Sequence, residues 1–144
     1  MAIWIEASAR FQKMMENGKV KKVTEQFLVQ ALSMSEAEAI VTEELKPYIS
    51  SDLTVSATKE SNISEIFYDD KGDKFYRVKA AFITLDEKSD VEKKAMFHYL
   101  VQAIDFHNAL ENFLDGMKGT VSDFEIVSIS ETKIVDVFET KSKE

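Results

Sequence analysis

The feature of this sequence that most constrains its fold is an internal repeat with a period of about 72 residues. Residues 27–33 (FLVQALS) recur as residues 99–105 (YLVQAID). Extending the alignment over residues 4–20, 21–46 and 52–67, with one-residue shifts between the blocks, gives 59 pairs of which 16 are identical. A repeated sequence predicts a repeated structural unit. We therefore expect two similar repeats, residues 1–70 and 71–144, packed as one compact body.

Each repeat begins with a pattern typical of a β-hairpin. Residues 3–12 alternate between apolar and polar side chains, which is the period of a half-buried strand. Residues 16–19 (ENGK) contain the Asn-Gly pair of a tight hairpin turn, and a second strand is expected over residues 21–32. The second repeat predicts the same elements over residues 75–85, 86–90 and 93–104.

A helix and two short strands follow the hairpin in each repeat. Ser33 with Glu36 forms a capping box, and Asp105 is a preferred helix N-cap. Pro47 is expected to end the first helix and Gly119 the second. Strands are expected at 52–59 and 63–68, and again at 123–130 and 133–138. The predicted fold class is α+β: a tandem β-β-α-β-β repeat with antiparallel sheets and two helices packed on one face.

The composition excludes several kinds of chemistry. The chain has no cysteine, so it has no disulfide, thiol chemistry or cysteine-based zinc site. His98 and His107 do not have the spacing of metal ligands, and neither a P-loop nor a dinucleotide-binding fingerprint occurs. No signal peptide or membrane span is evident. We therefore expect a cytoplasmic protein that is not an enzyme and needs no cofactor or metal.

Positive charge is concentrated in two stretches, although the formal net charge is −8. Residues 10–22 and 71–94 hold 12 of the 18 basic residues. This pattern predicts a basic hairpin side and an acidic remainder. The alternative is that these lysines are ordinary solvated residues of edge strands and turns.

The face of the hairpins turned away from the helices combines aromatic, cationic and amide side chains. Such a face can stack on bases and bond to them. The candidate ligand-binding residues are Trp4, Arg10, Lys22, Gln26, Gln30, Phe75, Arg77, Lys79, Lys94, His98 and Gln102. Alternatively, the apolar members of this face bury against the other repeat or a second subunit. Gln30 and Gln102 are equally candidates for a shared structural hydrogen bond.

Four segments resemble a family of short proteins of unknown function from Bacteroidetes and their phages and mobile elements. They are residues 21–29 (KKVTEQFLV), 82–88 (FITLDEK), 116–120 (GMKGT) and 130–138 (SETKIVDVF). The resemblance covers nearly the whole chain and carries no catalytic motif. It implies a bacterial or phage cytosolic setting.

The order of elements also resembles, at the level of topology, a family of single-strand-binding proteins. From residue 52 to residue 117 the sequence predicts four strands and then a helix. That is the unit of whirly and purine-rich-element-binding proteins, which bind through the sheet face and dimerise through helices. A likeness of strand order fixes no function.

These observations favour a phage or mobile-element accessory protein that binds single-stranded nucleic acid on a basic, aromatic sheet face. Two alternatives remain open. One is an anti-defence protein that sequesters a signalling nucleotide, and the other is an oligomeric structural or interaction protein whose apolar sheet face is an interface.

Overall fold

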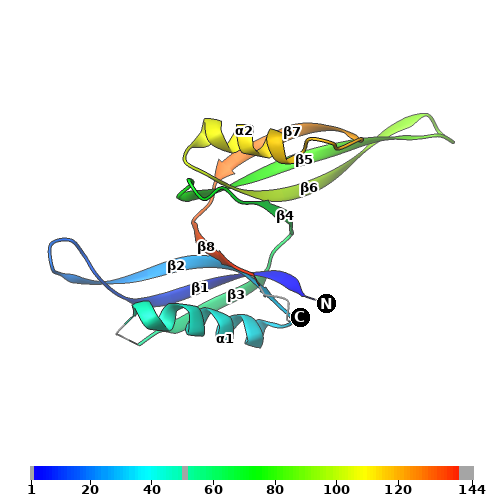
Figure 1. Cartoon of the computed structure of the whole chain (residues 1–144). Coiled ribbons are helices and arrows are strands. Elements are labelled where there is room, and N and C mark those ends of the chain that lie inside the picture. Colours follow the sequence, from blue (N-terminus) through cyan, green and yellow to red (C-terminus); the bar gives the residue numbers. More distant parts are fainter. Residues whose placement is uncertain (1, 50–51, 140–144) are drawn as a thin grey trace, which may run out of the picture. The chain divides into compact units, whose positions relative to one another are not determined.

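The chain folds into eight strands and two α-helices within residues 2–49 and 52–139, which the computed structural model describes (Figure 1). In chain order the elements are β1 (Ile3–Met14), β2 (Val20–Ala31), α1 (Met34–Leu45), the 3₁₀-helix η1 (Lys46–Tyr48), β3 (Thr54–Glu60), β4 (Ile63–Phe67), β5 (Lys74–Asp86), β6 (Val91–Ala103), α2 (Phe106–Gly116), β7 (Asp123–Glu131) and β8 (Ile134–Phe138). The α+β class is therefore confirmed, and the predicted strands and helices lie within a few residues of their expected bounds.

The strands form two separate four-stranded sheets. Their orders are β3-β1-β2-β8 and β4-β6-β5-β7. Three strands of each sheet are antiparallel, as the sequence predicts, but β8 runs parallel to β2 and β4 runs parallel to β6. These parallel pairs were not expected.

Two compact units result, and they do not coincide with the two sequence repeats. Unit 1 consists of residues 1–61 and 133–144, and unit 2 consists of residues 62–132. The last strand of each repeat therefore completes the sheet of the other unit. The predicted order of four strands and then a helix is present as β3, β4, β5, β6 and α2, but these strands do not form one sheet, because β3 pairs with β1 in unit 1. The likeness to whirly-type proteins is therefore limited to strand order.

Both helices begin at the predicted caps. The Ser33 hydroxyl accepts a hydrogen bond from the Glu36 amide at 3.1 Å, and the Glu36 carboxylate accepts one from the Leu32 amide at 2.8 Å. Asp105 accepts from the Asn108 amide at 2.8 Å. The bonds from the Glu36 and Asn108 amides satisfy first-turn amides that have no partner inside the helix, and the bond from the Leu32 amide ties the residue before the cap to the same turn. The predicted ends are also close, since η1 with Pro47 follows α1 directly and α2 ends at Gly116.

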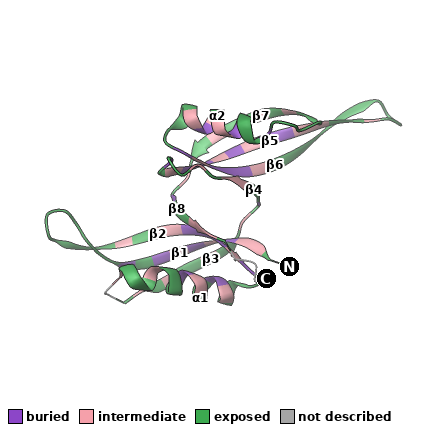
Figure 2. Cartoon of the chain, in the orientation of Figure 1, coloured by how far each residue is buried: buried purple, intermediate pink, exposed green. Residues whose placement is uncertain are grey.

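Each helix covers one face of its own sheet. In unit 1, alternate residues of β1 and β2 pack with Ala37 and Val41 of α1 in a buried core. In unit 2, Val78, Tyr99 and Phe113 lie in the corresponding core. The period-two burial of the strands (Figure 2) leaves the other set of strand residues on the opposite face.

The exchanged strands bring aromatic rings to both cores. Phe138 of β8 stacks on Phe27 with ring centroids 5.3 Å apart. Phe67 of β4 stacks on Tyr99 at 5.7 Å and contacts Phe113 at 6.1 Å. Each unit therefore depends on a ring supplied by the final strand of the other repeat.

Replacing Phe138 by Ala is expected to lower the free energy of unfolding by about 2–3 kcal/mol, because the ring is half-buried and its loss uncovers Phe27. Urea unfolding followed by tryptophan fluorescence measures this, since Trp4 is the only tryptophan and lies in unit 1. The control is Val135→Ala on the same strand, where the side chain is 49 % exposed and the loss is expected to stay below about 1 kcal/mol. Equal losses for the two variants would contradict a role of Phe138 in the core.

Candidate nucleic-acid interface

Five of the predicted ligand-binding residues lie on β1 and β2, on the face opposite α1. In the register of β1 and β2, Trp4 is opposite Gln30 and Lys22 is opposite Gln12. Lys22 is therefore the diagonal neighbour of Arg10. Arg10 and Lys22 are exposed, whereas Trp4, Gln26 and Gln30 are half-buried. Unit 1 thus brings two accessible cations together where the hairpin leaves the sheet.

Unit 2 brings together three of the predicted basic residues. Lys79 of β5 is directly opposite His98 of β6, and Arg77 is two residues from Lys79 on the same face. All three are half-buried. Arg77 donates a hydrogen bond from Nη1 to Oδ1 of Asn62 at 2.8 Å.

The imidazole of His98 is held in its neutral form. Burial lowers the pKa of His98 from its ordinary value of 6.5, and the positive charges of Arg77 and Lys79 lower this pKa further. Its Nδ1 atom is buried and has no hydrogen-bond partner within the described residues. His98 therefore contributes little positive charge to this face at neutral pH.

Two other predicted residues, Phe75 and Gln102, are committed to the fold. Phe75 is 4 % exposed and offers no ring face to a ligand. Gln102 donates from Nε2 to the Gly72 carbonyl at 3.0 Å and accepts at Oε1 from the Asp69 amide at 3.0 Å. It thereby anchors the loop between β4 and β5, which supports the structural alternative for this residue.

Lys94 is neutralised by an acidic neighbour on β7. Its Nζ lies 2.8 Å from Oε1 of Glu125, and the hydrogen bond to Glu125 raises the pKa of the lysine above its ordinary value. An ion pair across exposed strands contributes little to stability. It does reduce the charge that Lys94 can offer to an anion.

A feature that the sequence analysis missed is how far the first hairpin stands free of its sheet. Among the described residues, β3 pairs with β1 only as far as Arg10, and β8 pairs with β2 only from Gln26 onward. The part beyond, residues 12–22, is a two-stranded ribbon in which every residue is exposed (Figure 2). We call this segment the first ribbon.

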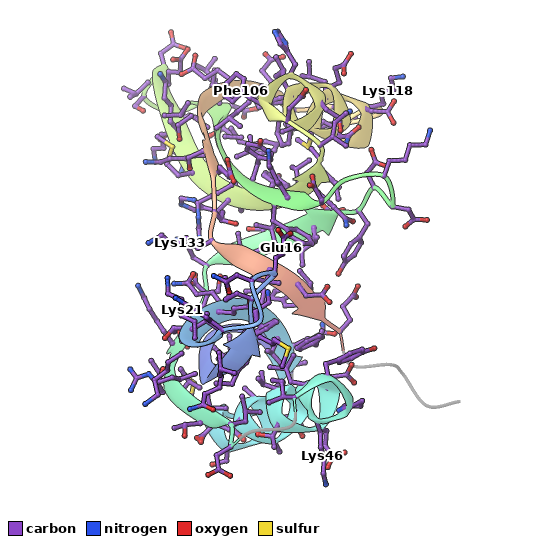
Figure 3. The ribbon with its side chains drawn as sticks, turned by 90° about the vertical axis from the view of Figure 1, so that its left-hand side faces the viewer. Glu16, Lys21, Lys46, Phe106, Lys118 and Lys133 are labelled. Carbon is purple, nitrogen blue, oxygen red and sulfur yellow. The ribbon has the colours of Figure 1, made fainter. Side chains whose placement is uncertain are left out.

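The first ribbon is strongly basic. It carries four lysines and one glutamate, which are Lys13, Lys19, Lys21, Lys22 and Glu16. Lys13 and Lys21 are directly opposite each other in the register, so their charges repel, and the Glu25 carboxylate 3.5 Å from Nζ of Lys13 offsets part of this repulsion. Figure 3 labels Glu16 in the turn and Lys21 on β2. The lysines were visible in the sequence, but their isolation on a free ribbon depends on where β3 and β8 stop.

The tip of the first ribbon is built by local bonds. Gly18 has a φ of +82°, a conformation that favours glycine. The Asn17 side chain accepts from the Lys19 amide at 3.0 Å, and the Met15 amide donates to the Lys19 carbonyl at 2.8 Å. The turn predicted from the Asn-Gly pair is confirmed.

The corresponding ribbon of unit 2, residues 84–94, has a different charge. Its four acidic residues outnumber its three lysines, and Lys93 lies 3.5 Å from the carboxylate of Asp86. The Lys88 amide also donates to Asp86, and this bond lowers the pKa of the carboxyl group. Only one of the two ribbons is therefore an electropositive element.

No site for metal-dependent chemistry is found within the described residues. No group of three or more His, Asp or Glu side chains there could hold a metal ion.

No helix of the described part is long and apolar enough to cross a membrane. The accessible chemistry of residues 12–22 is that of cations beside exposed apolar side chains.

The fold and these surfaces define an α+β protein of two units with a basic β-ribbon on one of them. Residues 3–140 match the family described as Domain of unknown function (DUF4494), and the chain belongs to this family. Neither a curated protein nor a solved structure matches the chain. The predicted resemblance to an uncharacterised family is thus confirmed.

His98→Gln, which copies the aligned Gln26 of the first repeat, is expected to make stability less sensitive to acid. The folded protein holds His98 at a lowered pKa, whereas the unfolded chain takes up its proton near pH 6.5. The native chain therefore loses stability as the pH falls below that value, and the variant lacks this loss. Urea midpoints of both proteins between about pH 7 and about pH 5 measure the difference. Parallel pH profiles would contradict a neutral, desolvated His98.

Proposed function

We propose that this protein is a non-enzymatic accessory protein that binds single-stranded nucleic acid, and that the first ribbon supplies its main phosphate contacts. The observation that carries the proposal is the charge and exposure of residues 12–22, with four lysines on a ribbon that is open to solvent on both faces. Phosphate contacts by lysine and arginine supply most of the affinity of sequence-independent binding.

The basic surface continues from the ribbon onto the sheet. Arg10 and Lys22 lie at the base of the ribbon, on the face opposite α1, and both are exposed. Five cations thus follow one another from this base to the tip. This refines the site expected from the sequence, which included more residues of unit 2.

Apolar side chains on the ribbon favour a single strand over a duplex. Met14 and Val20 are opposite each other and are 72 % and 57 % exposed. They lie beside the lysines, so a bound strand can place base faces on them while its phosphates meet the ammonium groups. A duplex hides its base faces by stacking and offers only base edges to a protein.

The acidic remainder of the protein limits this binding. A net charge of −8 repels a polyanion away from the ribbon. Binding is therefore expected to be weak at physiological salt and confined to the basic segment. This is the behaviour of an accessory factor that acts where nucleic acid is already concentrated.

A phage or mobile-element origin and a cytoplasmic site of action complete the proposal. The sequence resemblance to proteins of such elements supports them. Replication or recombination genes beside the gene for this protein would agree with this role.

Reversing two ribbon charges with Lys21→Glu and Lys22→Glu is expected to weaken binding of labelled single-stranded DNA and RNA at least about tenfold, because two phosphate contacts become repulsions. Fluorescence anisotropy at several salt concentrations measures this. Each lost contact also reduces the slope of log affinity against log salt by about 0.7.

The matched control is Lys88→Glu with Lys93→Glu, which makes the same change of net charge on the ribbon of unit 2. We expect at most about a twofold effect from that pair. Equal losses in both pairs would assign the effect to net charge alone. No binding of the native protein at tens of micromolar, or tighter binding of a duplex, would refute the proposal.

A further inference from the structure

A cavity in unit 1 lies on the same side of the sheet as α1, at the base of the first ribbon, whose residues Gln12, Lys13 and Met14 line part of it. Its volume is about 570 Å³, within the range of about 300–1,000 Å³ typical of small-molecule sites. All of its lining residues belong to unit 1, and they include Phe11, Glu25, Glu44, Tyr48, Asp136 and Phe138.

At one position that lines the cavity, unit 1 lacks an aromatic ring that unit 2 has. In unit 2, Phe97 packs edge-on against Phe82, with centroids 5.2 Å apart. The aligned residue of unit 1 is Glu25, which leaves the ring of Phe11 without this neighbour. The two residues occupy the same place in their hairpins, since Glu25 is opposite Ala9 and Phe97 is opposite Ala80.

A second replacement thins the core beside the cavity. Phe113 of α2 contacts the rings of Tyr99 and Phe124 in unit 2, at 5.2 and 5.9 Å. The aligned residue on α1 is Val41. Two cores of the same architecture are thus filled by side chains of different size.

The rim of the cavity extends past the end of α1. The 3₁₀-helix η1 continues directly from α1, and the side chain of Tyr48 is 84 % exposed. Figure 3 labels Lys46 where η1 begins. An exposed ring at the mouth of a cavity can close over a bound apolar group.

The lining combines aromatic and acidic side chains. The half-buried ring of Phe138, which stacks on the buried ring of Phe27, supplies aromatic surface, as does the exposed ring of Tyr48. The lining carries three carboxylates, Glu25, Glu44 and Asp136, against one cation. That cation, Lys13, already lies 3.5 Å from Glu25. The lining has a net charge of −2 and attracts cations.

We propose that this cavity is a binding site for a small organic cation with a flat apolar body, such as an aromatic or amidine-bearing amine. The apolar body lies against the accessible rings of Phe138 and Tyr48, where a cation over a ring face is also attracted by the π-system. The charged group lies toward Glu44 and Asp136. The net negative charge of the lining does not suit phosphate, so this proposal does not depend on nucleic-acid binding, although Lys13 and Met14 belong to both surfaces.

The proposal is tested with 2-naphthylmethylammonium as the probe, followed by amide shifts in ¹H–¹⁵N correlation spectra. We expect saturable shifts at Phe11, Phe27 and Phe138, with the neutral alcohol about tenfold weaker and 2-naphthylacetate weaker still. No saturable shift at these residues, or equal affinity for all three compounds, would overturn the assignment.

Variants of unit 1 test whether the probe binds in the cavity or is attracted by the net charge of the whole protein. Glu25→Phe copies unit 2 and is expected to abolish the shifts by filling the cavity. Glu44→Gln with Asp136→Asn is expected to remove the preference for the cation while binding of the neutral alcohol persists. The control pair Glu111→Gln with Asp123→Asn makes the same change of net charge on exposed residues of unit 2. An equal loss of cation preference in the control would overturn the role of Glu44 and Asp136.

Discussion

The constraint on which the rest of the structure depends is the parallel pairing of β8 with β2 and of β4 with β6. Each pairing satisfies the backbone groups of a strand that would otherwise be a sheet edge, and such edges invite association with other chains. Each also places an aromatic ring on the core. The short strands, five residues each, thus complete both the hydrogen bonding and the packing of a unit that begins elsewhere in the chain.

Two units of the same plan have diverged in what they offer to solvent. The ribbon of unit 1 is basic where that of unit 2 is balanced by Asp86 and its neighbours. Unit 1 has Glu25 in the lining of its cavity where unit 2 has Phe97. Both features lie in unit 1, and they meet at Lys13 and Met14, which belong to the ribbon and also line the cavity. The two units therefore share the arrangement of their strands and helix, and they differ in the charge and size of individual side chains.

Local features of the fold were predictable, and long-range ones were not. Alternation, the Asn-Gly turn and the Ser33 and Asp105 caps act within a few residues, so the sequence shows them directly. The exchange of β4 and β8 depends on which of two similar sheet edges each strand joins. The two strands have similar sequences, ISEIF in β4 and IVDVF in β8, so the sequence alone does not select between the edge of β2 and the edge of β6. The same limit applies to the site. Alternation predicted the face on which Lys94 and Phe75 lie. It did not predict that Lys94 pairs with Glu125 or that Phe75 is buried.

The strand exchange also sets an order in which the protein can be completed as it is synthesised. Unit 2 is one continuous stretch, residues 62–132, and has all its strands once β7 has left the ribosome. Unit 1 starts first but lacks its fourth strand until β8 emerges, because domains form as their residues become available. Until then, its hairpin and helix lack the ring of Phe138, so Phe27 stays uncovered while some seventy residues of unit 2 are synthesised. The unit that carries the basic ribbon and the open cavity is thus the last to close.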